Sequence, residues 1–102
     1  MQINNQDAVL RFLGLCMRAG QIVSGQDACV TKIRNKEVAV VFLDEGASDN
    51  TIKRITDACK QHQICMRVLE PGVLGYAIGR PERMVIAVLP GQMANKVLNL
   101  LT

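Results

Sequence analysis

The chain has 102 residues, of which 49% are hydrophobic and 21% are charged. This composition excludes a disordered chain, and the length predicts one domain that buries roughly two-thirds of the surface of its unfolded state. Twelve Lys and Arg against nine Asp and Glu give a net charge of +3, which is compatible with a nucleic-acid partner but not diagnostic of one.

The first half of the chain predicts two helices and two strands. Asp7 can cap a first helix that Gly20 ends, and residues 21–24 form a short strand or extended link. A second helix is expected over residues 26–35. Residues 38–43 are apolar throughout, which is typical of a strand covered on both faces.

The second half continues the alternation of helix and strand. Ser48 starts a run that caps a third helix, and residues 64–69 form the next strand. Gly72 lies at the start of a short fourth helix that Gly79 ends. The last strand covers residues 84–89, and Gly91 precedes the closing helix. This order predicts a single-domain three-layer α/β/α sandwich over residues 1–102, with a mixed central sheet of about four strands.

The sequence predicts neither a signal peptide nor a membrane-spanning segment. Residues 1–5 read MQINN, which is not a signal peptide, and no apolar run is long enough to span a bilayer. We therefore expect a cytoplasmic protein with no membrane partner.

Four cysteines lie in apolar patterns and are expected to be buried, reduced thiols: Cys16, Cys29, Cys59 and Cys65. Cys59, His62 and Cys65 stand at intervals of three, which leaves zinc as an alternative, although no fourth ligand is near. We expect neither a metal nor another cofactor.

Ligands of open α/β sheets collect beyond the carboxyl ends of the strands. Three segments qualify here, residues 24–27, 44–48 and 69–75. Asp44 and Glu45 leave open a small enzyme acting on a phosphorylated ligand, but with Asp49 they are better explained as charges that favour the start of the next helix. No phosphate-binding glycine motif or catalytic triad is present.

Basic residues gather in sequence around the second and third helices. Arg18 precedes the Gly25 turn, and the others follow it: Lys32, Arg34, Lys36, Lys53 and Arg54. From charge alone, a solvated helix face and an RNA-binding surface are equally good interpretations.

Three motifs resemble one family in the same order. They are LGLCMRAGQIVSGQD at residues 13–27, DEGASDNT at 44–51 behind an apolar strand, and LGYAIG at 74–79. Together they resemble the L-seven-Ae family of kink-turn RNA-binding ribosomal proteins, and they look most similar to its small bacterial YlxQ-like branch. The resemblance covers about residues 8–101.

The resemblance implies a non-catalytic, ribosome-associated monomer that grips a kink-turn in ribosomal or messenger RNA. It places Gly25, Gln26 and Asp27 at the bases. A second contact loop, with Glu45 beside it, would contain Glu70, Val73 and Leu74. The RNA backbone would meet the basic side chains Arg18, Lys32, Arg34 and Lys36.

The family's base-reading positions differ in this chain. The family commonly has Asn or Lys and then Glu or Gln after the glycine and its next residue, with a Lys three positions later. Here these positions hold Asp27, Ala28 and Thr31. An ionised Asp27 accepts hydrogen bonds but donates none. A protein-interaction or regulatory module of the same fold, without specific RNA binding, is therefore the alternative function.

Overall fold

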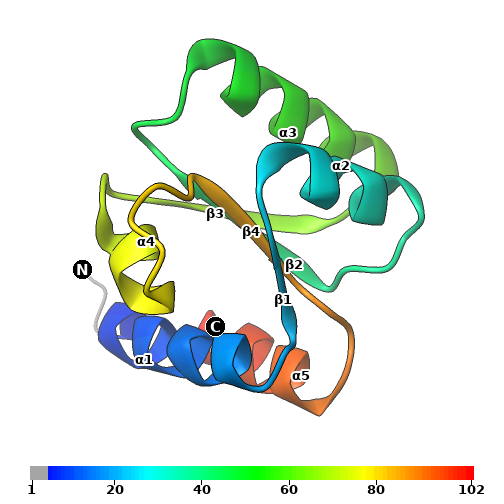
Figure 1. Ribbon diagram of the computed structural model, residues 1–102. Helices are drawn as coiled ribbons and strands as arrows, with labels where there is room; N and C mark the ends of the chain where they lie inside the picture. The colour runs from blue at the N-terminus through cyan, green and yellow to red at the C-terminus, as the bar shows by residue number, and fades with distance from the viewer. Residues whose placement is uncertain (1–4) are drawn as a thin grey trace.

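The computed structural model describes residues 5–102. Helices and strands alternate along this range (Figure 1). The elements in chain order are α1 (Asn5–Arg18), β1 (Ile22–Ser24), α2 (Gln26–Arg34), β2 (Val40–Asp44), α3 (Asp49–His62), β3 (Cys65–Leu69), α4 (Val73–Ile78), β4 (Val85–Val88) and α5 (Gln92–Leu100).

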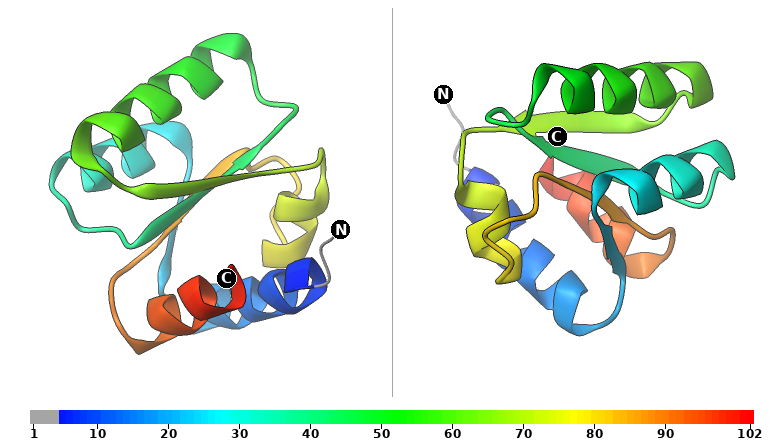
Figure 2. Two further views of the ribbon diagram at one scale, coloured as in Figure 1. Left: turned by 180° about the vertical axis from the view of Figure 1, so that it is seen from behind. Right: turned by 45° about the horizontal axis from the view of Figure 1, so that its top comes forward.

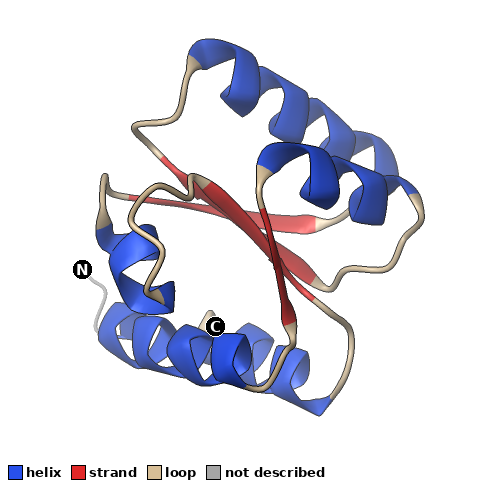
Figure 3. Ribbon diagram, viewed as in Figure 1, coloured by secondary structure: helices blue, strands red, loops and turns tan. Residues whose placement is uncertain are grey.

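The four strands form one mixed sheet in the order β1-β4-β2-β3. β2 and β3 are parallel, while β4 runs antiparallel to both of its neighbours, β1 and β2. Helices α2 and α3 cover one face of the sheet, and α1, α4 and α5 cover the other (Figures 2 and 3). The predicted three-layer α/β/α sandwich is confirmed.

The core consists of two apolar clusters, one on each face of the sheet. Phe42 and Ile86 point to the side of α1, where Leu13 meets them. Leu43 points to the opposite side and packs with Ile33 of α2 and Ile55 of α3. Because the central strands β2 and β4 serve both clusters, all of their side chains are buried, and this explains their continuous apolar sequence.

Several helix ends lie where the sequence predicts them. The Ser48 hydroxyl accepts a hydrogen bond from the Thr51 N–H at the start of α3. Gly72 and Gly79, both with positive φ, flank α4. The prediction that Asp7 caps the first helix is wrong, because α1 already begins at Asn5. Asp7 therefore lies in the first turn of α1. None of the described helices is long and apolar enough to cross a membrane.

Four connections meet at one end of the sheet, which we call the loop edge. β1, β2 and β3 all end there, and β4 begins there because it runs the other way. The loop edge thus consists of the β1–α2 turn at Gly25, the β2–α3 loop (residues 45–48), the β3–α4 loop (70–72) and the α4–β4 loop (79–84).

Candidate nucleic-acid interface

The β1–α2 turn brings bare backbone to the loop edge. Gly25 is the residue before α2, has φ +99° and provides no side-chain cap. Its N–H donates to the Val85 carbonyl at 3.0 Å, which fixes the turn against β4. A positive φ is readily adopted only by glycine. The first turn of α2 therefore presents its N-terminal backbone without a capping side chain of its own.

Arg83 of the α4–β4 loop lies directly beside this turn. A Cβ built on Gly25 would stand 3.1 Å from the Arg83 Nη1. The Arg83 Nε is buried and has no hydrogen-bond acceptor among residues 5–102. Its ion-pair partner, Glu82, is 3.7 Å away at Oε2, which is too far for a hydrogen bond. Arg83 thus brings unused donors to the start of α2.

Gln26 and Asp27 are both connected to α3. The Thr51 hydroxyl donates to Gln26 Oε1 at 2.5 Å, so the Gln26 amide nitrogen is left to donate elsewhere. Asp27 Oδ1 accepts from Arg54 at 2.7 Å, although the Asp27 side chain is 91% exposed. The ion pair balances the aspartate charge that would otherwise repel a phosphate at this helix start.

Asp44 joins two of the loops at the loop edge. Its side chain is only 2% exposed. One carboxylate oxygen accepts from the Gly46 N–H at 2.6 Å, and the other accepts from the Gly72 N–H at 3.0 Å. The interpretation of Asp44 as a charge that favours the α3 start is therefore wrong: the carboxylate is buried and is taken up by these two loop amides.

The basic residues predicted to meet the RNA backbone lie in two separate places. Lys32 is on the last turns of α2 and forms an ion pair with Glu37 at 3.4 Å. Arg34 and Lys36 are exposed at the same end of α2, so Arg34 is roughly 12 Å along the helix from Gln26. Arg18 ends α1 in the opposite helix layer (Figure 1). The sequence neighbours therefore do not form one patch.

The structure places most residues of the predicted second contact loop at or next to the loop edge. Glu45 and Glu70 are exposed at the loop edge, and Val73 is half-buried at the start of α4. Leu74 has no exposed surface and belongs to the core on the α1 side of the sheet. Its side chain therefore supports α4 and offers no surface to RNA.

Sequence reasoning missed the α4–β4 loop. It considered only the ends of strands, whereas the antiparallel β4 delivers the loop before it to the same edge. Gly75 holds this loop against α4, since a Cβ there would come within 2.7 Å of the Arg80 carbonyl oxygen. The charged run Arg80-Pro81-Glu82-Arg83 was the available signal.

The loop edge has two electrostatic halves. The half at β1 and β4 carries Arg80, Arg83 and Glu82, with the Arg54–Asp27 pair at the α2 start, and thus has one more positive than negative charge. The half at β2 and β3 carries the exposed Glu45 and Glu70. A polyanion is therefore attracted to the first half and repelled by the second.

The cysteines do not supply a reactive site. Burial raises the pKa of Cys29 to about 12 and that of Cys59 to about 11, and the Cys16 pKa is also raised. These thiols are protonated and poorly nucleophilic at neutral pH. Cys65 is only partly buried, which differs from the expectation of four core thiols. Residues 5–102 contain no cluster of three or more metal-binding side chains.

Comparison with known proteins gives a consistent set of relatives. The ribosomal protein L7Ae/L30e/S12e/Gadd45 family matches residues 7–97. A Bacillus subtilis (strain 168) protein named RNA-binding protein YlxQ is 42% identical over 91 residues, which cover 88% of this chain and 91% of that protein. The Enterococcus faecium protein of the same name is 28% identical over 102 residues and covers 99% and 98% of the two chains.

Two solved structures share the fold. A Bacillus halodurans protein of unknown function superposes with a TM-score of 0.81 at 35% identity, covering 90% of this chain and 94% of that one. A Giardia lamblia 15.5kD RNA binding protein superposes with a TM-score of 0.75 at 13% identity and covers 98% and 92%. At that identity the second structure supports the architecture alone.

Proposed function

Because this chain belongs to the ribosomal protein L7Ae/L30e/S12e/Gadd45 family, we propose that it is a non-catalytic protein that binds structured RNA at its loop edge. The predicted family resemblance is confirmed by the match over residues 7–97. In finer detail, we propose a kink-turn in ribosomal or messenger RNA as the ligand, bound by a monomer that associates with ribosomes in the cytoplasm.

The observation that carries this proposal is the position of the Arg83 side chain next to the uncapped helix start at Gly25. An uncapped helix start attracts anions through its free N–H groups and its dipole. Beside it, Arg83 Nη1 lies 3.1 Å from the position that a Gly25 Cβ would take, and the Arg83 ion-pair partner within residues 5–102 is Glu82. A phosphate or a base edge approaching Gly25 would therefore meet a guanidinium as well as the free N–H groups of the helix start.

The first turn of α2 supplies groups that discriminate between bases. The Gln26 amide nitrogen, left free by Thr51, can donate to the O6 or N7 of guanine. The second carboxylate oxygen of Asp27 can accept from an amino group of adenine or cytosine. Irregular RNA exposes these edges, whereas a regular A-form helix hides them in its deep major groove.

Phosphate contacts would extend from this point in two directions. Arg80 and Arg83 lie on the α4–β4 loop, while Lys32, Arg34 and Lys36 follow α2 away from the loop edge. We propose that the second group meets one flanking RNA stem. Arg18 is left out of this contact set, because α1 lies on the other face of the sheet.

The proposal is tested by binding to a kink-turn RNA and to a straight duplex of the same length and base composition, at low and near-physiological salt. We expect a preference for the kink-turn that survives at the higher salt. Equal binding that disappears with salt would leave only a basic surface and would favour the protein-interaction module of the same fold.

Gly25→Ala tests whether RNA approaches this turn, and Gly91→Ala is its matched control. Both glycines precede a helix and have extended backbone at positive φ, a region essentially restricted to glycine, so both substitutions strain the backbone by about 1–3 kcal/mol. A Cβ at position 91 meets nothing within 4 Å, and Gly91 follows β4 at the other end of the sheet. We expect an affinity loss of about tenfold or more only for Gly25→Ala; equal losses would place the RNA elsewhere.

A further inference from the structure

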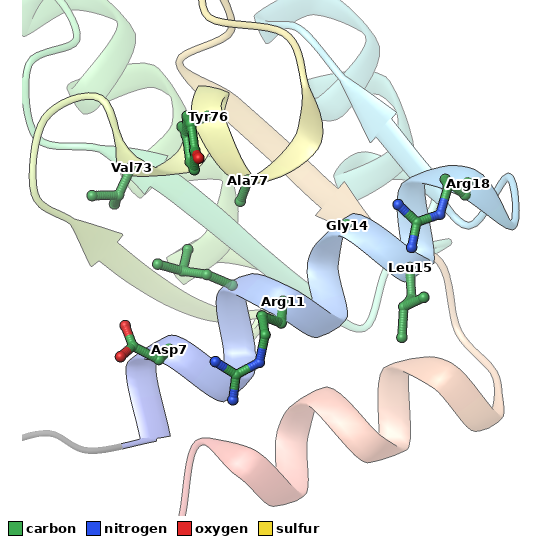
Figure 4. Close-up of a pocket in the computed structure, with 9 residues that line it drawn as sticks. Asp7, Arg11, Gly14, Leu15, Arg18, Val73, Tyr76 and Ala77 are labelled. Atoms are coloured by element: carbon green, nitrogen blue, oxygen red, sulfur yellow. The ribbon is translucent and has the colours of Figure 1, made fainter.

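A groove runs between α1 and α4, on the face of the sheet opposite α2 and α3 (Figure 4). Its volume is about 680 Å³, which is within the range of about 300–1,000 Å³ of ligand sites. The two helices meet closely at its floor, since a Cβ on Gly14 would lie 3.1 Å from the Ala77 carbonyl oxygen. We call it the α1–α4 groove.

The walls of the α1–α4 groove are mainly apolar. Leu10 and Leu15 come from α1, and Val73, Tyr76 and Ala77 come from α4. Tyr76 is 87% exposed and Leu15 is 44% exposed. Of the four large apolar side chains that are exposed in residues 5–102, these two therefore lie on the same groove. Clustered exposed apolar side chains mark an interaction surface.

Charges along α1 give the α1–α4 groove a direction. Asp7, Arg11 and Arg18 line it in succession, and roughly 16 Å of helix separates the first from the last. Within residues 5–102 neither arginine forms an ion pair. An acidic ligand would therefore be favoured at the Arg11–Arg18 end and disfavoured at Asp7.

These features favour a peptide over a nucleic acid. A strand of RNA binds through several aromatic platforms and a continuous positive track, whereas this groove has one tyrosine, aliphatic walls and an aspartate. An apolar groove about three turns long, with cations on its rim, fits an amphipathic helix whose apolar side chains are flanked by carboxylates. Tyrosine and arginine are also the residues that most often dominate protein interfaces.

We propose that the α1–α4 groove is a docking site for an acidic amphipathic helix of a partner protein. Leucine-like side chains of the partner pack on Leu15 and Tyr76, and its carboxylates pair with Arg11 and Arg18. The α1–α4 groove contains neither Gly25 nor Arg83 of the loop edge, so peptide binding can be measured without RNA.

The test uses the ¹⁵N-labelled chain and two synthetic helices of about 18 residues, long enough to be helical in water. The helices share one leucine stripe and differ only in having Glu or Lys beside it. We expect the Glu peptide to shift amide signals of α1 and α4, with at least tenfold weaker binding of the Lys peptide. Absence of binding, or equal binding of both peptides, overturns the proposal.

Charge reversal provides the sharper arm. In Arg11→Glu/Arg18→Glu, the preference should invert toward the Lys peptide. Lys60→Glu/Lys96→Glu makes the same change in net charge on exposed side chains of α3 and α5 and should leave the preference unchanged. The same response in both double variants would reduce the effect to net charge and overturn the site.

Tyr76→Ala distinguishes apolar packing of the peptide in the α1–α4 groove from electrostatic attraction to Arg11 and Arg18. Because Tyr76 is almost fully exposed, the variant should fold normally and bind the Glu peptide about tenfold more weakly. Unchanged affinity would contradict the proposal. A single-stranded RNA of mixed sequence is the third probe: if it shifts α1 and α4 at lower concentration than the peptide does, the groove is a nucleic-acid site and the proposal fails.

Discussion

Asp44 connects two of the loops at the loop edge. Its two carboxylate oxygens accept from the N–H groups of Gly46 and Gly72, at 2.6 and 3.0 Å, and thereby tie the β2–α3 loop to the β3–α4 loop. Because the side chain is buried, no water replaces either hydrogen bond when an acceptor is removed.

Asp44→Asn should therefore lower the free energy of unfolding by about 1–3 kcal/mol. Asparagine keeps one accepting oxygen and turns an NH₂ group toward the other loop amide. The measurement is urea unfolding of both proteins. Asp57→Asn is the control, because Asp57 is exposed in an i,i+4 pair with Lys53 and its loss should cost less than about 1 kcal/mol. An equal loss of unfolding free energy in both variants would show that Asp44 does not stabilise the two loops.

The buried thiols predict a loss of stability in alkali. Burial raises the pKa of Cys29 from 9.0 to about 12 and that of Cys59 to about 11. Between these values and 9.0, the unfolded chain loses thiol protons that the folded chain keeps, so the free energy of unfolding falls as the pH rises. Below pH 9, both thiols are protonated in the folded and unfolded chains, so their full contribution to the free energy of unfolding is present.

Cys29→Ala/Cys59→Ala should flatten this dependence. For each thiol, the slope can reach about 1.4 kcal/mol per pH unit within its window. Urea unfolding from pH 8 to 11 measures the slope, which is independent of any constant cost of the two truncations. If the variant and the parent lose stability in parallel, the thiols ionise equally in the folded and unfolded states, contrary to the structure.

At the scale of elements, α2 and α3 are joined at their N-terminal ends by two side-chain contacts. Gln26 meets Thr51, and Asp27 pairs with Arg54. The pair is largely exposed, so its effect on stability is below about 1 kcal/mol. Its importance lies in the charge that it balances at the helix start that we propose contacts RNA.

Arg54→Ala should consequently weaken RNA binding while leaving the unfolding midpoint nearly unchanged. Without Arg54, the charge of Asp27 faces the RNA phosphates unbalanced. Asp27→Asn in the same chain should restore most of the lost affinity, and a double-mutant cycle of RNA affinities measures this coupling. Additive effects of the two substitutions would show that the pair does not act as a unit.

The elements also show what could be predicted from sequence. The apolar runs identified β2 and β4, and Ser48, Gly72 and Gly79 marked helix ends, because these depend on local chemistry. Strand direction depends on tertiary packing. Arg83 reaches Gly25 because β4 runs antiparallel to β2, and this direction cannot be read from the sequence. The Arg54–Asp27 contact spans 27 positions and has no local signal either.

For the whole molecule, the modest net charge of +3 makes the distribution of charge more informative than its sum. The sequence placed the basic residues in one group, and folding separates them between the end of α1, the far end of α2 and the first half of α3. A proposed RNA path along α2 must therefore be tested with single cations rather than with net charge.

Lys32→Ala should reduce the salt dependence of RNA binding by about 0.7–0.9 in the slope of log K against log salt, as expected for one phosphate contact. The Lys32–Glu37 pair is exposed and 3.4 Å long, so it does not prevent Lys32 from reaching RNA. Lys96→Ala on α5 removes the same charge from an exposed site in the opposite helix layer and should leave the slope unchanged. An unaltered slope in Lys32→Ala excludes Lys32 as a contact.

The division of the core into two clusters, separated by the sheet, has a consequence for the evolution of the sequence. Side chains of α2 and α3 meet one face of the sheet, and those of α1, α4 and α5 meet the other. Substitutions that share no neighbours add in free energy rather than couple. Each helix layer can therefore accumulate mutations at its own pace, so one surface can acquire a new ligand while selection preserves the other.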